Sequence, residues 1–229
     1  MSLDSPFPLN GAVLHARSDG ALYWPDRETL IVADLHLEKG SAFASATGQM
    51  LPPYDSRATL TALRQAMAAT RPKRVICLGD SFHDIRAAAR LTPQDRDQLV
   101  GLTRQCDWVW IAGNHDPAPP ADLGGIVLEE VVDGPLVFRH EASPQAGAGE
   151  ISGHFHPKAA VETRARRLSA RCFVEDSRRL ILPAFGAYTG GLNVWDTAIS
   201  GLFPKGFTVH LALRQGVLRV PRSRLRKAA

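Results

Sequence analysis

Histidine and aspartate side chains gather at five places in the chain, each directly after a short apolar run. The five clusters are Asp34-Leu35-His36, Gly79-Asp80, Gly113-Asn114-His115-Asp116, Arg139-His140 and Gly153-His154-Phe155-His156. Imidazole and carboxylate groups suit divalent transition metals, whereas an all-oxygen Mg or Ca site does not need several histidines. The pattern predicts a centre that binds divalent transition-metal ions, with Mn as first candidate and Fe, Zn or Ni as alternatives.

The spacing within the clusters suggests how they bind. A two-residue offset in extended chain puts both side chains on one face, so Asp34 with His36, and His154 with His156, could each chelate locally. Three clusters also carry a glycine before a ligand-type residue. Glycine lets the backbone turn sharply out of a strand and approach an ion or a phosphate closely.

The apolar runs before the clusters predict the elements that position them. Residues 30–33, 74–78, 108–112 and 135–138 have the composition of buried strands. Helical spacing follows at 56–70 and 93–105, which predicts βαβ alternation. Open α/β sheets bind their ligands at the carboxyl ends of strands, so we expect the clusters to converge there.

The last third of the chain changes character. Residues 169–174, 179–182, 207–213 and 217–220 favour antiparallel strands. The glycine-rich stretch 183–191 is expected to loop back over the ends of the sheet.

Composition sets the class of protein. The chain has 229 residues, 45% of them hydrophobic and 22% charged, which is typical of a soluble globular protein with a single domain over 1–229. Cys77, Cys106 and Cys172 are widely spaced, which fits a reducing compartment. The start of the chain has no signal-peptide pattern, and no run of about 18 apolar residues occurs. We expect a cytoplasmic protein without a membrane anchor.

Taken in order, D-x-H, GD, GNHD, H and GHxH resemble the signature of the calcineurin-like metallophosphoesterases, over roughly residues 30 to 200. The resemblance implies an α/β fold, a four-layer αββα sandwich of two mixed β-sheets flanked by helices. It also implies the ligands. Asp34, His36 and His156 would hold one metal, Asn114, His140 and His154 the other, and Asp80 would bridge both.

The same resemblance gives His115 a catalytic role, since it would face the substrate and protonate or hydrogen-bond the leaving oxygen. A carboxylate should orient this imidazole, and Asp84 and Asp116 are both candidates. His83 stands where some relatives carry aspartate, so it could instead touch the substrate. Lys39 could reach a substrate phosphate from the loop after the first strand.

A narrower resemblance concerns the substrate. Residues 33–40 (ADLHLEKG) are similar to a bacterial branch of ligase-associated DNA-damage-response endonucleases, and residues 51–54 (LPPY) follow that branch loosely. This resemblance implies hydrolysis of phosphodiester bonds in DNA repair, with a ligase or helicase as partner. Hydrolysis of phosphomonoester bonds is the alternative. The oligomeric state is not indicated.

The net charge gives only weak support for DNA as the substrate, because it is formally +4. Two basic runs could form a footprint for the phosphate backbone if both lie on the face of the metal site. They are Arg164, Arg166, Arg167 and Arg171, and Arg222, Arg224, Arg226 and Lys227. The alternatives are a small-molecule or nucleotide phosphoesterase and, in another class, a catalytically inactive binding scaffold. His15 and His210 lie outside the clusters and are expected to be packing residues.

Overall fold

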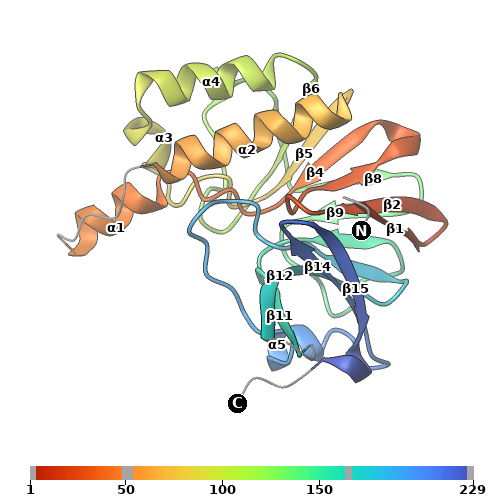
Figure 1. Ribbon diagram of the computed structural model, residues 1–229. Helices are drawn as coiled ribbons and strands as arrows, with labels where there is room; N and C mark the ends of the chain where they lie inside the picture. The colour runs from red at the N-terminus through yellow and green to blue at the C-terminus, as the bar shows by residue number, and fades with distance from the viewer. Residues whose placement is uncertain (1–3, 48–53, 163–166, 226–229) are drawn as a thin grey trace.

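Two mixed β-sheets pack face to face in the computed structural model, which describes residues 4–47, 54–162 and 167–225 (Figure 1). The first sheet has seven strands in the order β1 (Asp4–Leu9), β2 (Ala12–Arg17), β3 (Leu22–Trp24), β4 (Thr29–Val32), β5 (Arg74–Leu78), β6 (Asp107–Ile111) and β7 (Ile126–Leu128). Strands β1 to β4 are antiparallel, and β4 to β7 are parallel. The parallel half is the βαβ alternation that the sequence predicts.

The second sheet follows the order β15 (Gly216–Pro221), β14 (Thr208–Leu213), β12 (Arg167–Glu175), β13 (Arg179–Ile181), β10 (Glu150–Ser152), β9 (Leu136–Arg139) and β8 (Glu130–Asp133). An eighth strand, β11 (Lys158–Glu162), pairs with β12. Strand β10 is parallel to β9 and β13, and the other pairs are antiparallel. The fold class predicted from the sequence is therefore confirmed.

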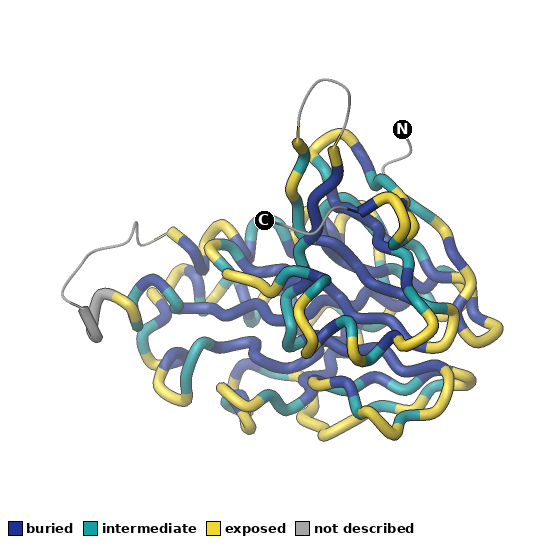
Figure 2. The backbone as a smooth tube through the Cα atoms, turned by 90° about the horizontal axis from the view of Figure 1, so that it is seen from below, coloured by how far each residue is buried: buried dark blue, intermediate teal, exposed yellow. Residues whose placement is uncertain are grey.

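The central strands are apolar without interruption because both of their faces are buried. Val75 and Cys77 of β5 point into the core beneath the helices, whereas Ile76 and Leu78 point into the core between the two sheets. Side chains alternate between faces along a strand, so a strand covered on both sides needs apolar residues at every position. Figure 2 shows the result: buried segments run through the middle and exposed ones through the turns.

Two helices, α2 (Asp55–Thr70) and α4 (Pro93–Thr103), lie side by side over the first sheet (Figure 1). Each is a crossover between parallel strands, as expected. α4 begins where the hydroxyl of Thr92 accepts a hydrogen bond from the amide of Asp95, a standard N-terminal cap. The remaining short helices are α1 (Lys39–Thr47), α3 (Ala87–Arg90), α5 (Thr197–Ser200) and the 3-10 turns Pro25–Arg27, Ala121–Leu123 and Arg222–Arg224.

The outer layer on the second sheet is thinner than a four-layer αββα sandwich implies. The four-residue α5, strand β11 and the aromatic rings of Phe203 and Phe207 cover it. Glycine-rich chain between β13 and α5 does not favour a helix there. The N-terminal strands β1 to β3 were also not predicted.

Within the described residues no helix is long and apolar enough to cross a membrane. Several sequence predictions fall outside those residues: positions 51–53 of the LPPY stretch, and Arg164, Arg166, Arg226 and Lys227 of the basic runs.

Arg171 is half-buried and bonded to main-chain carbonyls, so its guanidinium is not simply an exposed charge of the first basic run. Its guanidinium donates hydrogen bonds to the carbonyl oxygens of Asp19, Ala184 and Phe185. Those residues come from the first sheet's loops and from the chain after β13. Arg171 therefore ties the 183–191 loop to the body of the protein.

Arg171→Met should lower the free energy of unfolding by about 2 to 4 kcal/mol, because several carbonyl oxygens lose a charged donor. Arg167→Met, at an exposed position of the same strand, serves as control and should stay within about 0.5 kcal/mol of wild type. Urea denaturation in metal-free buffer measures both. Equal stability of the two variants would contradict the anchoring role.

Candidate metal centre

The predicted ligands stand in backbone conformations that side-chain-bearing residues rarely adopt. φ is positive at Asp34, His36, Asp80, His154 and His156, between 43° and 69°. Such a conformation costs about 1 to 2 kcal/mol per residue and persists where the surrounding structure imposes it, which is typical of functional sites. Neither pair of ligands lies in extended chain, so the expected reason for local chelation does not apply.

Backbone hydrogen bonds between neighbouring segments hold these turns. The amide of Asp34 donates to the carbonyl of Gly79 at 3.3 Å, and the amide of His36 donates to the carbonyl of Asp80 at 2.9 Å. The loops that follow β4 and β5 are therefore bonded to one another beyond the ends of their strands. This bonding brings the first and second sequence clusters into contact.

One group of donor atoms comes from Asp34, His36 and His156. Nε2 of His36 lies 3.2 Å from Nε2 of His156, which in turn lies 3.3 Å from Oδ1 of Asp34. Donors about 2.0 to 2.2 Å from a common ion are about 3 Å apart. The first group therefore fits a single divalent ion.

A second group comes from Asp80, His140 and His154. Nε2 of His140 lies 3.1 Å from Nδ1 of His154, and Oδ1 of Asn114 lies 2.8 Å and 3.1 Å from those two nitrogens. The second group has the same tight spacing. His154 and His156 thus belong to different groups, so the expectation that they chelate as a local pair is wrong.

Asp80 stands between the two groups. Its Oδ1 lies 3.5 Å from Nε2 of His140, and its Oδ2 lies 4.0 Å from Nε2 of His36. One carboxylate thus presents one oxygen to each group, which is the geometry that a bridging ligand requires.

The surroundings of His36 and His140 suit metal binding. Burial, followed by the charges of His156 and Lys39, lowers the pKa of His36 to about 2, so its imidazole is neutral. Nδ1 of His140 lies 2.9 Å from the carbonyl oxygen of Leu78. A carbonyl only accepts, so Nδ1 donates its proton to Leu78 and Nε2 is the ring atom that faces the other donors.

Glycines make room for ligands contributed by other segments. A Cβ on Gly113 would lie 2.2 Å from the amide nitrogen of Asp80, and one on Gly79 would lie 2.3 Å from Nδ1 of His140. On Gly153 it would lie 2.6 Å from an oxygen of Asp34. The glycines of the motif are needed for these close approaches.

His115 lies over the metal donors with 43% of its side chain exposed, and its Nε2 is 3.9 Å from Oδ2 of Asp80. Its Nδ1 lies 2.8 Å from the carbonyl oxygen of His83, whose ring stacks on that of His115. Hence a main-chain carbonyl, rather than a carboxylate, orients the imidazole.

The two carboxylates expected in that role have other partners. Asp84 forms an ion pair with Arg90, which holds the pKa of Asp84 below its usual value. Asp116 accepts a hydrogen bond from the amide of Phe82, and burial raises the pKa of Asp116 to about 7. Asp116 thus supports the backbone beside Asp80.

Two features near the metal donors were missed by the sequence interpretation. Glu141, next to a ligand, lies 3.8 Å from Nε2 of His154. A cavity of about 250 Å³ opens beside His156 and is lined in part by Lys158 and Tyr188. The glycine-rich stretch was the available signal for this cavity. Lys39 is half-buried at the start of α1, near enough to His36 to affect its pKa.

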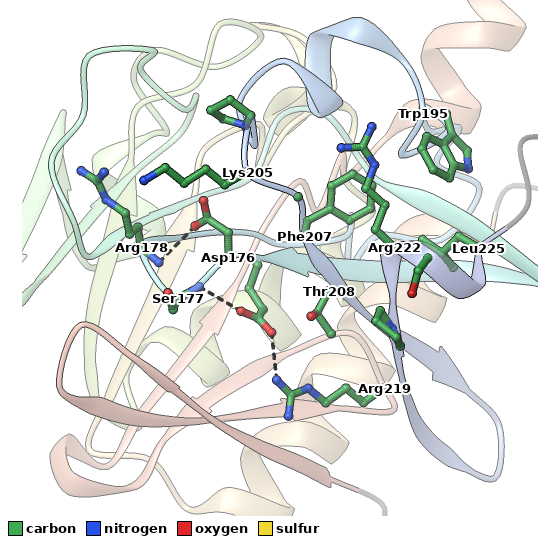
Figure 3. Close-up of a pocket in the computed structure, with 15 residues that line it drawn as sticks. Asp176, Ser177, Arg178, Trp195, Lys205, Phe207, Thr208, Arg219, Arg222 and Leu225 are labelled. Atoms are coloured by element: carbon green, nitrogen blue, oxygen red, sulfur yellow. Dashed lines mark hydrogen bonds and ion pairs between the residues drawn. The ribbon is translucent and has the colours of Figure 1, made fainter.

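Arg222 and Arg224, the described residues of the C-terminal basic run, lie at the opposite ends of the strands. Arg222 packs on Trp195 and Phe207 in a cavity of about 1100 Å³, beside the turn that precedes β13 (Figure 3). The metal donors instead follow the carboxyl ends of β4, β5 and β10. Within the part of the chain that the structure describes, Arg222 therefore lies away from the metal donors, whereas Arg171 lines a cavity that also includes His156.

Two mixed sheets, with two carboxylate–imidazole groups joined by one aspartate at the strand ends, define a hydrolase of the binuclear metal class. The calcineurin-like phosphoesterase family model matches residues 28–191, so the chain belongs to this family.

Among solved structures, the crystal structure of Pseudomonas putida nuclease MPE is similar to this chain, with 30% sequence identity and a TM-score of 0.74. The match covers 95% of this chain and 100% of the nuclease chain. A second match is Yfce, a phosphoesterase from E. coli, with 12% sequence identity and a TM-score of 0.42. That match covers 84% of this chain and 98% of the Yfce chain. No curated protein sequence matches the chain.

The wild-type chain, stripped with EDTA and dialysed against Mn²⁺, should bind two ions, and Asp80→Asn should bind fewer because the shared donor is weakened. His15→Gln, outside the site, should keep both ions. Elemental analysis with calorimetry measures the stoichiometry. Two tightly held ions in Asp80→Asn would contradict a bridging role.

Proposed function

We propose that this hydrolase is a Mn²⁺-dependent phosphodiesterase that cleaves DNA, in a cytoplasmic repair role. The observation that carries the hydrolytic part is the pair of donor groups joined by Asp80. The choice of DNA as substrate is supported by the 30% identity with a nuclease over the whole of that nuclease's length. The basic runs do not strengthen this proposal, because Arg171 is tied to main-chain carbonyls and Arg222 lies at the opposite strand ends.

The site residues have separate tasks. Asp34, His36 and His156 would hold one ion, Asn114, His140 and His154 the other, and Asp80 would contact both. Bound there, two divalent ions acidify a water molecule and neutralise phosphate charge. These ligand assignments explain why imidazoles and buried carboxylates are collected at one point.

His115 would handle the leaving group. With its Nδ1 proton donated to the carbonyl of His83, Nε2 is the atom that exchanges a proton. That carbonyl stabilises the imidazolium as well as the neutral ring. The exposed Nε2 can then protonate the leaving oxygen as the P–O bond breaks.

His115→Ala should slow cleavage of a thymidine dinucleotide about 10² to 10⁴-fold. Its effect on a p-nitrophenyl diester should be smaller, because nitrophenolate leaves without a proton. Metal content should match wild type, and His15→Gln should retain full activity. Equal losses on both leaving groups would indicate a positioning role, and no loss would exclude His115 from the reaction.

The substrate proposal is tested with a panel of nitrophenyl mono- and diesters, nucleotides, and single-stranded and duplex DNA, each with Mn, Ni, Zn or Mg. We expect Mn-stimulated cleavage of diesters and DNA, measured by nitrophenolate release and gel electrophoresis. Hydrolysis of free nucleotides with intact DNA would favour the small-molecule alternative. No hydrolysis in any combination would favour the binding scaffold, against which the complete donor set argues.

A further inference from the structure

A cavity of about 250 Å³ adjoins the metal centre on the side of His156. Its lining includes His156, Lys158, Arg171, Gly186, Tyr188 and Thr189. One wall is therefore a predicted metal ligand, and the others come from β11, β12 and the 183–191 loop. Any group placed in this cavity lies next to a phosphate held at the metals.

The 183–191 loop is bonded to the metal-binding segments. The amide of Gly186 donates to the carbonyl of Asp34 at 3.2 Å, and the amide of Ala187 donates to the hydroxyl of Thr59 at 2.9 Å. A Cβ on Gly186 would lie 2.1 Å from the carbonyl oxygen of Leu35. The guanidinium of Arg171 donates hydrogen bonds to carbonyl oxygens of the same loop. The loop is thus positioned together with the ligands.

Tyr188 is the residue that this loop presents. Its φ is +57°, and 55% of its surface is exposed. Glycine or asparagine suits this conformation better than an aromatic residue, and exposure rules out core packing as its purpose. An exposed aromatic ring, on a loop that is hydrogen-bonded to the segment of Asp34 and lines a cavity with His156, is suited to stacking on a base.

Positive charge accompanies the ring. Lys158 is half-buried, and its Nζ has a long contact of 3.5 Å with the carbonyl of Thr189. The cavity lining contains no carboxylate among the described residues. An ammonium beside an aromatic ring and a phosphate site matches a nucleotide's combination of a flat base and an anionic backbone.

We propose that this cavity is a nucleoside subsite, in which Tyr188 stacks on the base attached to the scissile phosphate and Lys158 contacts the adjacent backbone phosphate. This proposal rests on the proposed phosphodiesterase function and adds a determinant of substrate choice. In this proposal, recognition depends on contacts with the nucleotide at the site.

The test compares two diesters with one leaving group: thymidine 5′-(p-nitrophenyl) phosphate and methyl p-nitrophenyl phosphate. Tyr188→Ala should lower kcat/KM about tenfold or more for the thymidine ester and leave the methyl ester within about twofold. Tyr188→Phe should behave as wild type, because stacking needs only the ring. Leu192→Ala, an exposed residue nearby that does not line the cavity, is the matched control.

Lys158→Met should raise KM for an oligonucleotide and not for the methyl ester. Equal effects of Tyr188→Ala on both esters, or none on either, would overturn the subsite while leaving phosphodiesterase activity intact. If wild type hydrolyses neither ester, the proposed function fails. Calorimetry with thymidine 5′-monophosphate then decides the subsite: weaker binding to Tyr188→Ala than to wild type supports it, and equal or absent binding rejects it.

Discussion

The carboxylate of Asp80 must face two groups of donors at once, and much of the local structure follows from that demand. The residue turns out of β5 with a positive φ, and its two oxygens point toward His140 and His36 respectively. This approach is open only because position 113 lacks a side chain. The loops after β4, β5 and β6 therefore have to be shaped together.

The centre also combines features that are unfavourable without a cation. Asp34 and Asp80 are almost fully buried, and the ring nitrogens of the histidines beside them lie only 3.1 to 3.2 Å apart in each group. A buried carboxylate without a cation beside it lacks a compensating charge. Divalent ions would supply that charge, which is a physical reason for five strained residues at one point.

Patterns that repeat locally were predicted well. The runs at 30–33 and 74–78 could be identified as strands because burial on two faces requires apolar residues throughout. The helices at 56–70 and 93–105 were identifiable by their spacing. Where a property depends on distant chain, prediction failed: Arg171 looked like surface charge, yet its partners are 13 to 152 positions away. The glycines looked like turn residues, yet their neighbours are side chains of other clusters.

The sequence by itself determined which residues are available for metal binding and catalysis: strands followed by histidine and aspartate, in an order that indicates the family. Tertiary structure decided the surroundings of these residues. It gives His115 a carbonyl partner in place of Asp84 or Asp116, and it places Tyr188 in a cavity that His156 also lines. The physical reason is that side-chain type is written along the chain, whereas coordination and orientation depend on distances between segments that only packing brings together.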